Sequence, residues 1–125
     1  FDFADWERTY RGLLDQARQA NPALKIVLCT PFAAPCGKIV EGALGEYYPL
    51  RQRILAQCCV IVERIAADYG ATLVPFHRLI ADLETRLPNG DATYWVWDGI
   101  HPTPAGQRLM ADCWIGAAAR NGVME

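Results

Sequence analysis

The chain has 125 residues, enough for one domain or for part of one. Its 52% hydrophobic and 21% charged residues favour a folded globular unit over a disordered segment. The formal net charge is −2 and no basic stripe runs along the sequence, so nucleic acid is not an expected partner, and the apolar runs are too short to span a membrane.

The first half predicts a helix, a strand and a long loop. Helical spacing of apolar residues predicts a helix over residues 3–20, which Asn21 and Pro22 end. Its expected inward residues are Phe3, Trp6, Tyr10, Leu13, Leu14 and Ala17. The run KIVLCT (25–30) predicts a strand buried on both faces. Residues 31–46, with three glycines and two prolines, predict a long loop of the kind that is often functional.

The second half predicts three helices around a second strand. A helix over residues 49–69 ends at Gly70, and ATLVPF (71–76) follows as a strand. The expected inward face of this helix comprises Leu50, Ile54, Cys58, Ile61 and Ile65. Further helices are predicted over 78–87 and 104–119, separated by a loop over 88–102.

The order of these elements predicts an α/β fold. Two apolar strands joined through a helix imply a parallel pair with a right-handed crossover and helices on both faces. Two strands are fewer than the usual sheet of about four to six. Either a partner completes the sheet, or the chain is the back half of a larger α/β domain.

The stretch DGIHPTPAG (98–106) is unusually constrained for a loop. Pro102 and Pro104 each push the preceding residue toward extended backbone. Thr103 can then cap the following helix, with Pro104 at its first position. His101 is therefore expected just outside a helix start, in a fixed direction.

Asp98 and His101 can form a catalytic pair. A histidine with a carboxylate that fixes its tautomer is suited to general-base chemistry near pH 7. The structural alternative is a turn-forming Asp before Gly99 and a solvated histidine. A hydroxyl nucleophile is not evident, because the sequence contains no serine and none of its threonines sits in a strand-to-helix turn.

DGIHPTPAG resembles the last block of the SGNH (GDSL-type) esterase/lipase family, with Asp98, His101 and Pro102 in its D-x-x-H-P positions. NPALKIVLCTP (21–31) and YGATLVPF (69–76) resemble the family's fourth and fifth strands. The resemblance implies a flavodoxin-like three-layer α/β/α sandwich with a parallel sheet. Residues 1–125 would be the C-terminal portion of a single such domain, with two core strands plus helices.

The same resemblance implies hydrolysis of a small carboxylic ester through an acyl-enzyme. The substrate would be an acyl ester or an acetylated sugar. Only Asp98 and His101 carry over as catalytic residues. The family's Ser, Gly and Asn, from its G-D-S and G-x-N-D blocks, have no counterpart, so the chain is expected to begin just after the second block and to need the N-terminal half of the domain. No metal or organic cofactor is implied.

Three other interpretations remain open. The chain could be a non-catalytic flavodoxin-like module that pairs its sheet edge with another chain. Cys29 or Cys36 could replace the serine. Asp98 and His101, with His77, could instead bind a metal.

The remaining candidates are aromatic residues and thiols. Trp95 and Trp97 could form an aromatic wall for substrate, or could pack on the last helix, and the packing role is favoured for at least one of them. The five cysteines include no C-x-x-C pair, which indicates buried thiols in a reducing compartment and so slightly favours the cytoplasm.

Overall fold

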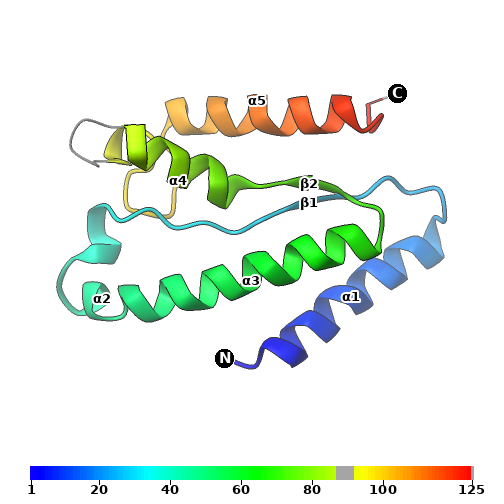
Figure 1. Cartoon of the computed structure of the whole chain (residues 1–125), viewed down its shortest axis with the longest axis horizontal. Coiled ribbons are helices and arrows are strands. Elements are labelled where there is room, and N and C mark those ends of the chain that lie inside the picture. The colour runs from blue at the N-terminus through cyan, green and yellow to red at the C-terminus, as the bar shows by residue number, and fades with distance from the viewer. Residues whose placement is uncertain (87–91, 125) are drawn as a thin grey trace.

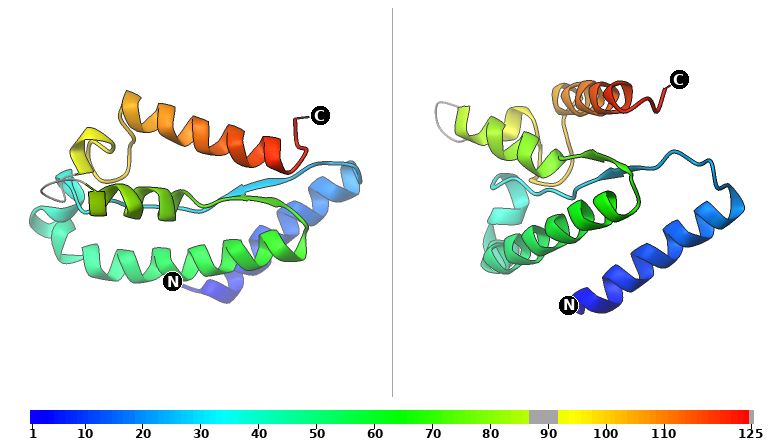
Figure 2. Two further views of the ribbon diagram at one scale, coloured as in Figure 1. Left: turned by 45° about the horizontal axis from the view of Figure 1, so that its top comes forward. Right: turned by 45° about the vertical axis from the view of Figure 1, so that its right-hand side comes forward.

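A two-stranded parallel sheet with helices on both faces forms the centre of the protein in the computed structural model, which describes residues 1–86 and 92–124 (Figure 1). Strand β1 (Val27–Cys29) pairs in register with β2 (Thr72–Val74). Helices α1 (Phe3–Ala20) and α3 (Tyr48–Asp68) lie on one side, and α5 (Pro104–Arg120) lies on the other, as the two views in Figure 2 also show. The predicted three-layer α/β arrangement is confirmed.

The main core lies between the sheet and the layer of α1 and α3. Ile61 and Ile65 are buried because they recur four residues apart on one face of α3. With them are buried Ile26, Leu28, Val62 and Ala66, and the half-buried Phe3, Trp6, Tyr10 and Leu14 of α1 pack against this cluster. None of the 18 residues of α1 is fully buried.

A second, smaller core lies beyond the carboxyl ends of the strands. Its buried residues come from the loop after β1, from α4 (Phe76–Arg86) and from the segment before α5. They are Ala34, Cys36, Ile80, Ala92 and Val96. This cluster holds together three segments that are far apart in the sequence.

Several element boundaries differ from the sequence-based prediction. Both strands are three residues long, and α4 begins at Phe76, within the predicted second strand. The predicted loop over 31–46 contains a 3-10 turn, η1 (Gly37–Val40), and a short helix, α2 (Gly42–Glu46). A second 3-10 turn, η2 (Ala92–Tyr94), interrupts the predicted loop over 88–102. Residues 88–91 of that loop and residue 87 of the predicted helix 78–87 lie outside the described residues.

Two predicted inward residues are exposed. Leu13 is 62% exposed and Leu50 is 47% exposed. Leu50 lies in the first turn of α3, at the end that extends past the strands toward α2, so no sheet is present to cover it (Figure 1). Leu13 lies in α1, a helix none of whose residues is fully buried.

The helix ends follow the expected local chemistry. The Asp2 carboxylate caps α1 by accepting the Asp5 N–H, and the Thr103 hydroxyl caps α5 by accepting the Gly106 N–H at 3.1 Å. Gly70 takes a positive φ of 58° directly after α3, as predicted. Among the described residues, no helix combines the length and the apolar character that crossing a membrane requires.

Candidate active site

Asp98 and His101 are in direct contact. The Nδ1 atom of His101 lies 2.7 Å from Oδ2 of Asp98. The other carboxylate oxygen, Oδ1, accepts the backbone N–H groups of Ile100 at 3.0 Å and of His101 at 2.8 Å. The carboxylate therefore closes a tight turn with one oxygen and orients the imidazole with the other.

These contacts set the electrostatics of the pair. The backbone N–H of His101, its ring and the N–H of Ile100 together hold the pKa of Asp98 well below its usual range. An ionised Asp98 accepts a hydrogen bond from the Nδ1–H of the imidazole in the tautomer whose Nε2 keeps a free lone pair. The His101 side chain is 73% exposed, so Nε2 is open to an incoming group.

A narrow hairpin presents the pair. Val96 and Pro102 form an isolated antiparallel bridge, and the Trp97 N–H donates to the His101 carbonyl at 2.9 Å. Beyond the bridge, Thr103 donates its N–H to the Trp95 carbonyl and caps α5. Asp98 and His101 thus lie at the tip of a hairpin whose base is fixed to a helix.

The loop after β1 supports this hairpin through contacts that could not be predicted from the sequence. The Ala34 N–H donates to the Gly99 carbonyl at 2.9 Å, and the Cys36 thiol donates to the Val96 carbonyl at 3.2 Å. Gly37 packs directly on the backbone of Asp98. The only signal in the sequence was the concentration of glycines between 37 and 45.

The two candidate tryptophans have different environments. Trp95 is half-buried, packs against the second core and makes an edge-on contact with the Tyr94 ring at 4.8 Å between centroids. Trp97, beside Asp98, is 62% exposed. Packing accounts for Trp95, whereas Trp97 is free to contact a ligand.

None of the five cysteines, all within the described residues, is in a disulfide, and three of them are buried: Cys36, Cys58 and Cys59. Cys36 donates to a carbonyl, and burial raises the pKa of the Cys29 thiol. A raised pKa lowers the thiolate fraction, so neither Cys29 nor Cys36 has the environment of an activated nucleophile.

His77 lies apart from Asp98 and His101. It occupies the second position of α4, where its Nδ1 atom lies 2.7 Å from the Thr30 hydroxyl at the end of β1. Within residues 1–86 and 92–124, no three His, Cys, Asp or Glu side chains gather closely enough to hold a metal ion. The structure thus does not bring His77 to the pair as the metal alternative required.

Comparisons with known proteins identify the class of this chain. Residues 1–109 match the GDSL-like lipase/acylhydrolase family. The protein belongs to this family, as the D-x-x-H-P block indicated. A search among curated proteins found no match.

Two solved structures have the same fold. A protein from Parabacteroides merdae described as a GDSL-like lipase is 29% identical, with a TM-score of 0.74, and covers 90% of this chain and 48% of its own. A catalytic mutant of an acetylxylan esterase from Geobacillus stearothermophilus is 25% identical, with a TM-score of 0.68. The match covers 91% of this chain and 46% of the esterase. The chain therefore spans about half the length of these structures.

Proposed function

We propose that the chain is the C-terminal portion of a carboxylic ester hydrolase, with His101 as general base and Asp98 as the acid that orients it. The observation that carries the proposal is the 2.7 Å contact between His101 Nδ1 and Asp98 Oδ2, which leaves Nε2 free and exposed. Membership of the GDSL-like lipase/acylhydrolase family supports ester chemistry at this pair.

The proposed reaction needs a hydroxyl from outside these 125 residues. Nε2 of His101 removes the hydroxyl proton while the oxygen attacks the ester carbonyl, and the carbonyl electrons move to oxygen. When the tetrahedral intermediate collapses, His101 returns the proton to the departing alcohol and an acyl-enzyme remains. His101 then deprotonates a water whose oxygen attacks the acyl carbon, the bond to the enzyme oxygen breaks, and His101 returns the proton to that oxygen as the acid leaves. Asp98 stays ionised and stabilises the imidazolium in both halves of the reaction.

The sheet geometry supports a missing N-terminal half. The Ile26 carbonyl and the Thr30 N–H bond to β2, so the backbone groups of Val27 and Cys29 point to the opposite edge of β1, which no described strand covers. Helix α1 precedes β1 on the same face as α3 (Figure 1). If a parallel strand precedes α1, the right-handed crossover rule favours this open edge as its position.

Helix α1 is consistent with that arrangement. Its apolar face packs on the main core, yet none of its residues is fully buried. A further strand beside β1 would lie under this face and cover it. The N-terminal half would thus both supply the nucleophile and cover the open edge of the sheet.

The proposed substrate is a small ester, of an acyl group or an acetylated sugar. One structural neighbour is an acetylxylan esterase, which favours a sugar ester. Trp97, exposed beside Asp98, is placed to stack on a sugar ring or an acyl group. Trp95 is half-buried and packs against the second core.

The open edge of β1 also supports the second candidate, a non-catalytic module that pairs with another chain. Sedimentation of the isolated 125 residues separates the two. Concentration-dependent association favours the module, and a monomer that binds only the upstream half favours the hydrolase.

The direct test is p-nitrophenyl acetate hydrolysis by the natural full-length protein. The coding sequence upstream of Phe1 is expected to contain G-D-S and G-x-N-D blocks. His101→Ala should lower kcat/KM by about 10²-fold or more. Arg108→Ala, an exposed change in the adjacent helix, is the control and should leave it unchanged. Full activity in the His101 variant would refute the assignment.

A further inference from the structure

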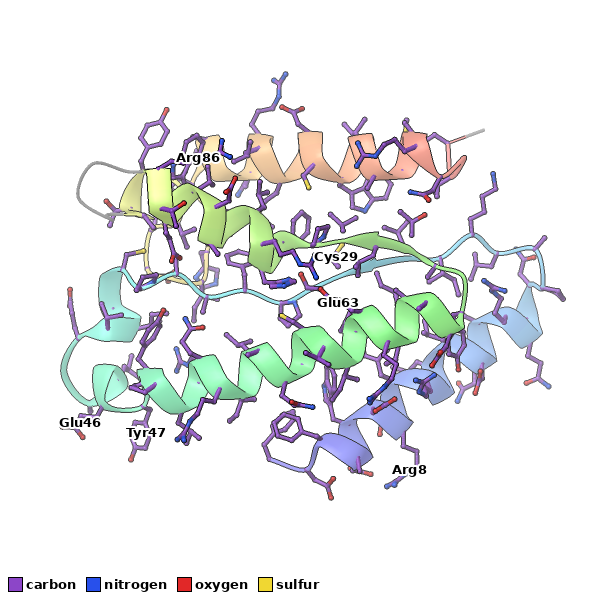
Figure 3. The ribbon with its side chains drawn as sticks, in the orientation of Figure 1. Arg8, Cys29, Glu46, Tyr47, Glu63 and Arg86 are labelled. Atoms are coloured by element: carbon purple, nitrogen blue, oxygen red, sulfur yellow. The ribbon has the colours of Figure 1, made fainter. Side chains whose placement is uncertain are left out.

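A cavity of about 460 Å³ lies between α3 and α4, and the proposed reaction does not use it. Its size falls within the range of about 300–1,000 Å³ found for small-molecule sites. One wall is the first half of α3, the opposite wall is α4, and the loop after β1 closes the end. In Figure 3 the loop after β1 runs between α3 and α4, and Glu46 and Tyr47 project from the side of α2 and α3 that faces away from α4.

The cavity is separate from Asp98 and His101. The loop after β1 turns Phe32, Ala33 and Pro35 toward the cavity. From its other side it turns Ala34 and Cys36 toward the hairpin, where they bond to the Gly99 and Val96 carbonyls. The loop is therefore a wall between two sites, and none of the described cavity-lining residues comes from the hairpin or from α5.

Glu84 gives the cavity its charge. It is the one acidic side chain among the described lining residues, and it forms no ion pair with a described residue. Burial raises its pKa, which reflects the cost of holding a carboxylate there without a partner. A bound cation would supply that partner.

The other polar lining residues carry no positive charge; Arg51, which acts electrostatically on Tyr48, lies outside the lining. His77 is bonded to Thr30 through Nδ1, and burial lowers its pKa, so it is neutral at pH 7. The Gln52 amide donates to the Ala33 carbonyl at 3.0 Å and to the Tyr48 hydroxyl. Glu63 lies beside His77, pointing from α3 toward the strands (Figure 3), and is paired with Arg78 outside the cavity lining.

The walls suit the apolar part of an organic cation. Phe32 and Tyr48 present aromatic rings, and Leu55 and Ile80 present aliphatic surface. Aromatic rings and aliphatic surface pack against the apolar groups that an organic cation carries, and ring faces also attract an ammonium group nearby. We propose that this cavity binds a small organic cation, with its ammonium group at Glu84 and its apolar body against Phe32 and Tyr48.

Calorimetric titration of the natural full-length protein with benzyltrimethylammonium tests this proposal. The wild type should bind the probe saturably at one site, and Glu84→Gln should weaken binding about tenfold or more. Asp82→Asn removes an equal charge from the exposed face of the same helix and should bind as the wild type does. Benzyl alcohol, a neutral ligand of similar shape, should bind both the wild type and Glu84→Gln weakly and equally.

Absence of saturable binding to a folded wild type, or equal binding by wild type and Glu84→Gln, would overturn the proposal. Thermal unfolding of Glu84→Gln shows whether the variant is folded, and Tyr48→Phe, which keeps the ring, should retain binding. His101→Ala should bind the probe normally. The esterase assignment can thus fail while this site is confirmed, and this site can fail while the esterase assignment is confirmed.

Discussion

Gly37 lies against the main chain of Asp98, so closely that a methyl group on Gly37 would stand 2.5 Å from the Asp98 Cα and 2.7 Å from the Trp97 carbonyl oxygen. Gly37 also has a φ of 64°, which side chains disfavour. The loop after β1 and the Asp98–His101 hairpin can therefore approach only because residue 37 has no side chain. The conformation of the candidate catalytic pair depends on this contact.

Gly37→Ala should destabilise the fold and displace the hairpin. Backbone strain costs about 1–3 kcal/mol, and the clash with Asp98 adds a cost of similar size. Gly70→Ala is the matched control, because Gly70 has a φ of 58° but open space around it. Urea unfolding should show a clearly larger loss in the free energy of unfolding for Gly37→Ala than for Gly70→Ala. Equal losses would mean that the contact with Asp98 contributes nothing.

Thr103→Ala should weaken the base of the hairpin. Its hydroxyl accepts the Gly106 N–H as the cap of α5 and donates to the Tyr94 carbonyl at 2.7 Å. Loss of the cap alone costs about 0.5–2 kcal/mol. Thermal unfolding should show a lower Tm for Thr103→Ala, while Thr103→Ser, which keeps the hydroxyl, stays near the wild type. A Tm unchanged by alanine would contradict the capping role.

Ile65→Ala tests the main core. Ile65 is fully buried against the strands, and truncating a buried isoleucine costs about 2–5 kcal/mol. Ile115, on the outer face of α5, is 47% exposed, so Ile115→Ala should change the free energy of unfolding much less. Denaturant titration of both variants measures the difference, and similar losses would place Ile65 outside the core.

The Asp98 carboxylate should make stability depend on pH in the acid range. Its hydrogen bonds with His101 and Ile100 lower its pKa in the folded state relative to the unfolded chain, where it is about 3.9. A lowered folded pKa contributes stability that is complete above about pH 5 and is lost as the pH falls toward the folded pKa. Unfolding of wild type and Asp98→Asn should differ most near neutral pH and converge in acid. A difference that grows on acidification would have the wrong sign.

Local sequence predicted the features that depend on neighbouring residues. Pro102, Thr103 and Pro104 specify the start of α5, and the contact between Asp98 and His101 spans only three residues. The apolar runs around Val27 and Val74 predicted the parallel strands, because each run is a property of neighbouring residues. Each of these depends on short-range sterics or on hydrophobic periodicity.

Features that depend on distant segments were not predicted. The contact of Gly37 with Asp98 joins residues 61 positions apart, and nothing in either segment alone specifies it. Leu50 fits the helical period of α3, yet the sheet ends before reaching it. The turn η1 and the helix α2 form within a glycine-rich stretch whose composition favours a loop.

A double-mutant cycle on p-nitrophenyl acetate turnover by the natural full-length protein tests the proposal that Asp98 acts through His101 in ester hydrolysis. Asp98→Asn and His101→Ala should each lower kcat/KM strongly, and the double variant should be no slower than His101→Ala alone, because residues that act as a unit are non-additive. If the two single losses in kcat/KM multiply in the double variant, or if His101→Ala is as active as the wild type, Asp98 does not act through His101.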